Sequence, residues 1–278
     1  MPPSAFPKDR HMHASKITRM ATLLGALTTT SLAQAAIDNG HFSAGLAGWQ
    51  TFGDVAALSN HTLGLPLNGN ALVLSTASLG ADDHPLANGH YNVSGQEAGA
   101  IGTAGGLEDF VGVAIGSLDP DPIDHTSALW EGSAARQSFT VQAGDTLSFT
   151  WNLLSADHDF ADQAFVVIDT HTAQGLQVLA LGDAAQATQV VGGNINLLQT
   201  GWRQFTHTFA NAGTVTLSLA VADLDASDQT SLLTVDNVAL TVAVPEPGTA
   251  VLALLGLLSV GAFIRRSSQS VSTTTLMW

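Results

Sequence analysis

The chain is 278 residues long, carries a formal net charge of −15 and contains no cysteine. The lack of cysteine excludes a disulfide scaffold and a four-cysteine zinc site. The negative charge argues against nucleic acid as a partner, because contacts to phosphates need a basic patch.

Residues 1–36 have the pattern of a secretory signal peptide. Lys16 and Arg19 form a positive start, residues 21–32 are a short apolar stretch, and Ala33-Gln34-Ala35 has the small-x-small pattern of a cleavage site. The alternative is a buried N-terminal helix. The pattern predicts an exported protein.

The alternation of apolar and polar residues within 37–244 predicts one all-β domain. Apolar and polar residues alternate along 147–153 and 215–221, which is the two-residue period of a strand with one buried face. Apolar faces of this kind must pack on another sheet, so we expect an antiparallel β-sandwich with Trp151 in its core. Further strands are expected near 139–141, 165–168, 203–209 and 232–242, and one at 109–115 within the irregular residues 76–127.

Two short motifs at the ends of this domain resemble jelly-roll carbohydrate-binding modules. Asn-Gly-His-Phe at 39–42, followed by Gly48-Trp49, is similar to their opening, and Val-Asp-Asn-Val at 235–238 to their closing strand. The resemblance implies a jelly-roll-like sandwich with Trp49 in its core, where the related modules bury theirs. It also implies a polysaccharide ligand and a structural calcium between the first and last strands. Asp236 matches the carboxylate of the last strand, whereas Ser43 stands where an acidic residue is expected.

Aspartates recur as Asp-x-Asp-x-x-Asp in three segments between apolar runs. Calcium takes about six to eight oxygen ligands, and carboxylates two residues apart on a tight loop can supply several of them. We expect calcium on at least one of these loops; the alternative is that aspartate only serves as a turn residue in an acidic chain. The candidate metal ligands are Asp119, Asp121, Asp124, Asp157, Asp159, Asp162, Asp223, Asp225, Asp228 and Asp236.

Three aromatic residues are candidate carbohydrate contacts. Trp202 shares one side of its expected strand with Gln204, Trp130 lies beside Glu131, and Tyr91 belongs to the irregular region. Aromatic rings with a polar neighbour suit a surface that is partly apolar and partly wet. We therefore expect Trp202, Trp130 and Tyr91 at the surface; the alternative is that they close the ends of the sandwich.

The C-terminal residues combine three unlike features. Pro245-Glu246-Pro247 is followed by the apolar residues 249–264 and then by Arg265 and Arg266. A helix over 249–264 would be about 24 Å long at ~1.5 Å per residue, which is short but possible for a transmembrane helix. The basic pair predicts that its C-terminal end faces the cytoplasm.

This order of features resembles the PEP-CTERM sorting signal of Gram-negative bacteria. The resemblance implies that an exosortase-type enzyme recognises residues 245–266 and that the inner membrane holds the chain in transit. The final location is then the cell surface or the extracellular polysaccharide matrix. Residues 267–278 extend beyond the usual end of such a signal. The alternative to a sorting signal is a simple C-terminal membrane anchor.

Catalytic motifs are missing from the sequence: there is no Gly-x-Ser-x-Gly elbow, His-Glu-x-x-His motif or phosphate-binding glycine loop. We therefore expect a non-catalytic exported protein that binds polysaccharide. Two alternatives stay open. One is a purely structural acidic matrix protein without a specific ligand. The other is a divergent glycoside hydrolase, which needs two facing carboxylates in a cleft.

Overall fold

The computed structural model describes residues 37–59, 64–67, 69–77, 91–119, 128–156, 160–192, 197–224, 229–243 and 256–259. The expected signal peptide lies outside these residues, as does the expected sorting signal apart from 256–259, which are helical. No helix within the described ranges is long and apolar enough to cross a membrane.

The domain is built almost entirely from strands. The strands are β1 (Gln50–Phe52), β2 (Asp54–Leu58), β3 (Ala71–Ser75), β4 (Gly99–Ala100), β5 (Leu129–Val141), β6 (Thr146–Ser155), β7 (Gln163–Asp169), β8 (Leu176–Asp183), β9 (Gln189–Val190), β10 (Leu198–Gln199), β11 (Arg203–Thr208), β12 (Gly213–Leu224) and β13 (Ser231–Thr241). The helices are α1 (Leu107–Val111) and the 3-10 helix η2 (Ala184–Gln186).

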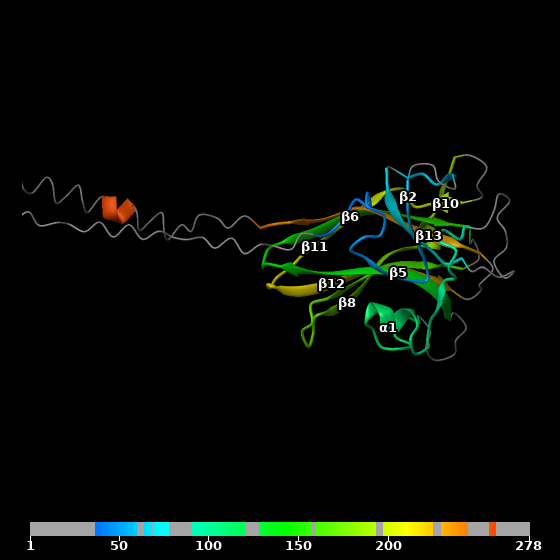
Figure 1. Cartoon of the computed structure of the whole chain (residues 1–278), viewed down its shortest axis with the longest axis horizontal. Coiled ribbons are helices and arrows are strands. Elements are labelled where there is room, and N and C mark those ends of the chain that lie inside the picture. Colours follow the sequence, from blue (N-terminus) through cyan, green and yellow to red (C-terminus); the bar gives the residue numbers. More distant parts are fainter. Residues whose placement is uncertain are drawn as a thin grey trace, which may run out of the picture. The chain divides into compact units, whose positions relative to one another are not determined.

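The strands form two antiparallel sheets that pack face to face (Figure 1). Sheet A has the order β1-β5-β12-β7-β8, with β4 paired to β5. Sheet B has the order β2-β3-β13-β6-β10-β9, with β11 paired to β6. This confirms the predicted antiparallel β-sandwich.

The core lies between the sheets and uses the predicted alternation. Leu147, Phe149 and Leu153 of β6 are at most 1% exposed and face Leu217 and Leu219 of β12, within one apolar cluster. Burying a side chain of this size stabilises the fold by about 1.5–3 kcal/mol. The two tryptophans that the sequence places in the core, Trp49 and Trp151, are buried there.

A second apolar cluster covers part of the outer face of sheet A, where Figure 1 shows α1. The prediction of a strand at 109–115 is wrong. Residues 107–111 are helical, and Gly112 ends the helix with a φ of 84°. The buried carboxylate of Glu108 accepts hydrogen bonds from the backbone of Gly102 (3.1 Å) and Leu118 (3.2 Å). These bonds fold the segment back on itself. Of the two alternating valines, Val111 therefore belongs to the helix and Val113 to the loop that follows it.

One serine connects the two sheets through the core. Ser133 Oγ in β5 accepts a hydrogen bond from the Asp54 backbone N–H (2.8 Å) and donates one to the Ser75 carbonyl oxygen (2.6 Å). The carboxylate of Asp54 in turn accepts hydrogen bonds from the backbone of Val93 and Ser94. Burial raises the pKa of Asp54. This polar chain fixes the irregular residues 91–96 on sheet B.

Candidate functional site

Trp202, the first of the predicted aromatic contacts, lies beside an acidic side chain on the outer face of sheet B. Thr150 and Asp236 are directly opposite each other in β6 and β13. They point away from the core, since the next residues along each strand, Trp151 and Val235, point into it. Together with Asn237 and Trp202 they line a hollow of about 120 Å³, which we call the Trp202 hollow.

The indole ring of Trp202 is held in place from outside the sheet. Its Nε1–H donates a hydrogen bond to the carbonyl oxygen of Pro66 at 3.3 Å, and the side chain is half-buried. The ring therefore lines the hollow in a fixed orientation. An aromatic face beside carboxylate, amide and hydroxyl groups can take both the C–H surface and the hydroxyls of a sugar ring.

Asp236 is the charged group of this hollow. It is 6% exposed, and its carboxylate accepts hydrogen bonds from the backbone N–H (2.6 Å) and the side-chain amide (3.0 Å) of Asn237. Burial raises the pKa of Asp236, while the hydrogen bond from Asn237 and the nearby His41 oppose this effect. The strand register shifts between Asp236 and Ala239, and Asn237 has a φ of 58°, so a β-bulge turns the Asn237 amide toward its neighbour.

The opening turn at residues 39–42 lies against this bulge. The Gly40 carbonyl oxygen accepts a hydrogen bond from Val238 N at 2.9 Å, and His41 Nδ1 is 4.0 Å from the Asp236 carboxylate. The first segment of the domain therefore meets the last strand. The side chain from this turn that approaches Asp236 is a histidine, whereas Ser43 lines a neighbouring hollow of about 310 Å³.

One aspartate from each of two triplets lies at the same end of the sandwich. Asp162 and Asp223 are fully buried at the adjoining ends of β7 and β12, where Gln163 pairs with Ala222. The carboxylate of Asp162 accepts a hydrogen bond from the backbone of Leu224 at 3.0 Å.

The remaining predicted metal ligands are only partly described. Asp119 is half-buried. Across the described part of the chain, no group of three or more histidine or acidic side chains is arranged to hold a metal ion. Six of the predicted ligands lie outside the described residues: Asp121, Asp124, Asp157, Asp159, Asp225 and Asp228.

The other two aromatic candidates, Trp130 and Tyr91, differ in how far their side chains are exposed to solvent. Trp130 is 58% exposed at the surface of β5, as expected. Tyr91 is only 4% exposed, so its expected surface position is wrong. It belongs to a third apolar cluster on the outer face of sheet B, together with Leu65 and Leu154. The irregular segment covers this face, which the sequence pattern did not indicate.

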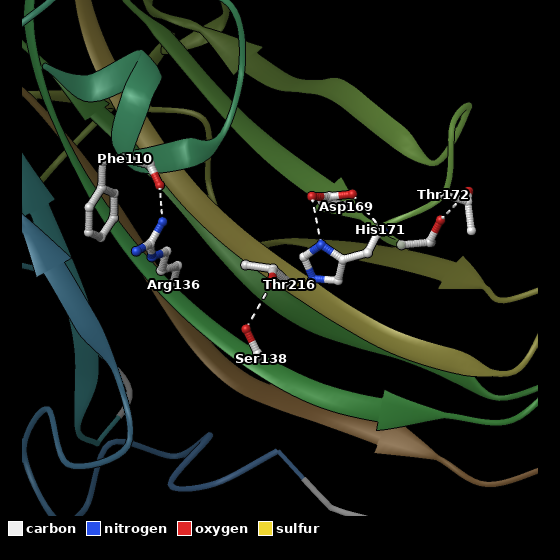
Figure 2. Close-up of polar contacts among 8 residues, drawn as sticks. Phe110, Arg136, Ser138, Asp169, His171, Thr172 and Thr216 are labelled. Atoms are coloured by element: carbon white, nitrogen blue, oxygen red, sulfur yellow. Dashed lines mark hydrogen bonds and ion pairs between the residues drawn. The ribbon is translucent and has the colours of Figure 1, made fainter. Parts of the chain in front are cut away.

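A polar row crosses the exposed outer face of sheet A, as Figure 2 shows. His171 lies between Asp169 (Nδ1 to Oδ2, 3.1 Å) and Thr216 (Nε2 to Oγ1, 3.0 Å), and Thr216 shares a hydrogen bond of 2.8 Å with Ser138. The order of groups is that of an acid–base–nucleophile triad. However, Thr216 pairs with strands on both sides, so the backbone N–H groups around it are used within the sheet and cannot stabilise an oxyanion. The row is a hydrogen-bonded surface.

Next to this row, Arg136 is held over an aromatic ring. Its guanidinium lies 4.4 Å from the ring centroid of Phe110, and its Nε donates a hydrogen bond to Gln50 Oε1 at 2.8 Å (Figure 2 shows Arg136 and Phe110). The contact attaches α1 to β5.

Sequence reasoning missed several of these groups. Thr150, Asn237 and His41 were not predicted as site residues, although Asn237 and His41 fall within the two motifs that resemble carbohydrate-binding modules. Asp236 was predicted only as a metal ligand. Its place beside Trp202 depends on the register between β13, β6 and β11, which a single sequence does not specify.

Comparison with protein families identifies the C-terminal segment. The family model described as the PEP-CTERM protein-sorting motif matches residues 243–267, which confirms the resemblance of this segment. A comparison with curated protein sequences gives no match.

Solved structures with a similar fold include carbohydrate-binding modules. TmCBM61 in complex with β-1,4-galactotriose has 9% sequence identity and a TM-score of 0.39, over 76% of this chain and 99% of that chain. A structure described as "CBM4 structure and function" has 14% identity and a TM-score of 0.32, over 72% of this chain and 98% of that chain. The K3 adhesin domain of Lys-gingipain from Porphyromonas gingivalis W83 has 14% identity and a TM-score of 0.38, over 75% of this chain and 100% of that chain.

Proposed function

We propose that this chain is an exported, non-catalytic protein that binds polysaccharide through the Trp202 hollow. The observation that carries the proposal is the meeting of Trp202 with Asp236, Asn237 and Thr150 in one hollow. The indole ring offers an apolar face for sugar C–H groups, and the polar side chains around it can bind hydroxyls. The two-sheet sandwich, which we take to be jelly-roll-like, supplies a rigid support for these groups.

The sorting motif supports export. A match to the PEP-CTERM motif at 243–267 agrees with a signal peptide over 1–36 and a transmembrane helix over 249–264. In this proposal, an exosortase-type enzyme processes the chain while the inner membrane anchors it. The domain is then released to the cell surface or the extracellular matrix of a Gram-negative bacterium, where polysaccharide is the available ligand.

We include calcium in the proposal as a structural ion at the loops of Asp162 and Asp223. Both carboxylates are fully buried, and they lie at adjoining strand ends. Asp162 is preceded in its triplet by Asp157 and Asp159. Asp223 is followed in its triplet by Asp225 and Asp228. Oxygen ligands from two adjoining strand ends suit the coordination that calcium prefers.

Retention of the full-length chain on immobilised polysaccharides tests the proposed function. The panel contains cellulose, galactan, xylan, mannan and the exopolymer of the producing bacterium. We expect retention on at least one polymer and at least ~10-fold weaker binding by Trp202→Ala, because a buried aromatic anchor is often worth more than ~1.4 kcal/mol. Trp130→Ala is the matched control, since it removes an exposed tryptophan outside the hollow. Equal retention of Trp202→Ala and the unmodified chain would overturn the site. No retention on any polymer would favour the structural matrix protein.

A further inference from the structure

A further hollow opens between the two sheets, away from the Trp202 hollow. It has a volume of about 380 Å³ and lies between the turn that joins β7 to β8 and the turn that joins β11 to β12. We call it the edge cleft, because among the described strands β8 is the last of sheet A and β11 pairs with β6 alone. Its size is within the range of about 300–1,000 Å³ that is usual for small-ligand pockets.

The edge cleft has an apolar floor and a neutral polar rim. Val141, Phe209 and Val215 line it from the core and are at most 2% exposed. The polar side chains at its rim are amides and hydroxyls: Thr170, Thr172, Gln174, Gln177, Thr208, Asn211 and Thr214. None of the described residues that line it is an aspartate, glutamate, lysine or arginine. This is unusual for a chain with 23 acidic residues.

The titratable side chain of the cleft is also held in its neutral form. His207 packs edge-on against Phe209, with ring centroids 4.9 Å apart. Burial lowers the pKa of His207, so the imidazole is uncharged at neutral pH. A ligand that enters the cleft therefore meets hydrogen-bonding groups without a formal charge.

Both walls are fixed by hydrogen bonds, so the cleft is formed before any ligand arrives. On one wall, the fully buried Asp145 accepts hydrogen bonds through its carboxylate from Gln142 N (2.7 Å) and Ala243 N (2.9 Å), and through its carbonyl oxygen from Phe209 N (2.9 Å). On the other wall, Thr170 N donates to the Gly175 carbonyl oxygen at 3.1 Å.

The tight form of this second turn depends on glycine. A Cβ atom on Gly175 would lie 1.8 Å from Thr170 Oγ1 and 2.4 Å from Thr172 Oγ1, and these two hydroxyls share a hydrogen bond of 3.1 Å (Figure 2 shows Thr172 at this turn). The turn thus holds two hydroxyl side chains at the rim of the cleft.

We propose that the edge cleft is a binding site for an uncharged, hydroxyl-rich ligand, namely a segment of a neutral glycan. Its amide and hydroxyl groups can exchange hydrogen bonds with sugar hydroxyls, and its apolar floor can cover a sugar C–H face. Neutral groups lose less solvation energy on binding than charged groups do. An acidic glycan finds no cationic partner among the described lining residues, and the net charge of −15 repels it.

This inference goes beyond the proposed function, because the two sites are separate surfaces. Trp202 precedes β11 and Thr208 ends it. Six residues of extended strand separate them by about 20 Å at ~3.3 Å per residue. Trp202 lies on the outer face of sheet B, whereas the cleft opens between the sheets.

Titration calorimetry of the full-length chain tests the edge cleft. The probes are short neutral oligosaccharides of glucose, galactose, mannose and xylose, with oligouronates as the acidic probe. Ala212→Trp fills the cleft from an exposed turn position, and the double variant Gln177→Ala/Asn211→Ala removes two rim amides. Gln204→Ala is the control, since Gln204 is exposed on β11 but does not line the cleft.

We expect the full-length chain to bind at least one neutral probe, with an affinity that is at least ~10-fold weaker in both cleft variants and unchanged in Gln204→Ala. Binding of no neutral probe, equal binding by the cleft variants and the control, or a preference for oligouronates would each overturn the edge cleft. If the cleft variants bind like the unmodified chain while Trp202→Ala does not, the cleft fails and the proposed function stands. The opposite pattern removes the Trp202 hollow and supports the cleft.

Discussion

The indole nitrogen of Trp202 donates a hydrogen bond to the carbonyl oxygen of Pro66, a residue 136 positions earlier in the chain. The bond connects the segment before β11 to the segment before β3, so it sets the orientation of the ring before a ligand binds. Such preorganisation favours binding because less side-chain freedom is lost when the ligand arrives.

The variant Trp202→Phe distinguishes the contribution of the aromatic ring to binding from that of its hydrogen bond to Pro66. Phenylalanine keeps an aromatic face but cannot donate the bond to Pro66. We expect its affinity for a retained polysaccharide to lie between those of the unmodified chain and Trp202→Ala, measured on the same polymer. Affinity of Trp202→Phe as low as that of Trp202→Ala means that the anchor, rather than the ring surface, controls binding.

Ser133→Ala tests the polar connection between the sheets. The change leaves the Asp54 N–H and the Ser75 carbonyl oxygen in the core without the partner that Ser133 Oγ provides. We expect a loss of about 1–3 kcal/mol in the free energy of unfolding, measured by urea denaturation. Ser138→Ala is the matched control, because Ser138 Oγ bonds to Thr216 on the exposed face. Its cost should stay within ~0.5 kcal/mol. Equal losses for the two variants contradict a buried bridge.

The pH dependence of stability should carry a contribution from Asp236. Burial raises the pKa of this carboxyl above the ordinary value of an aspartate. The folded state then binds more protons than the unfolded state, so this contribution to stability is present below the unfolded pKa and is lost as pH rises through the folded one.

The variant Asp236→Asn removes that titration. Relative to the unmodified chain, its stability should improve as the pH rises above about 3.9, the usual pKa of an aspartate in an unfolded chain. Thermal unfolding at a series of pH values measures the difference. A difference that does not change across this range shows that Asp236 titrates alike in both states.

Calcium at the loops of Asp162 and Asp223 predicts a stability change on chelation. Calcium at ~100 times its dissociation constant should stabilise the fold by about 2.7 kcal/mol, and chelator should remove this gain. The gain should disappear in Asp162→Asn and persist in Asp169→Asn, whose carboxylate lies outside all three triplets and contacts His171. Identical unfolding temperatures in calcium and in chelator rule out the ion.

The strands were predictable where one face of the sheet is buried. The alternation in β6 and β12 follows from the period of the strand, so the sequence alone indicated the buried side. The same rule failed at 109–115, because the hydrogen bonds of the Glu108 carboxylate decide that local structure. Hydrogen bonds from the backbone to a side-chain acceptor leave no periodic signal in the sequence.

The candidate site was predictable only in parts. Trp202 and Asp236 were each singled out, but for different roles, since nothing in a single sequence reveals that β11 and β13 flank the same strand, β6. Tyr91 was misplaced for a related reason: its surroundings come from Leu65 and Leu154, which belong to other segments. The edge cleft combines two turns that are about 40 residues apart, and no motif marks it.

Polysaccharide binding at the Trp202 hollow is tested most directly by the indole N–H resonance of Trp202 in a nitrogen-15 NMR titration with a retained polysaccharide fragment. The chain has five tryptophans, and Trp202→Phe assigns the resonance by its loss. We predict that the ligand shifts the Trp202 signal and leaves those of the buried Trp49 and Trp151 nearly unchanged. Saturating ligand that leaves the Trp202 signal in place contradicts polysaccharide binding at this hollow.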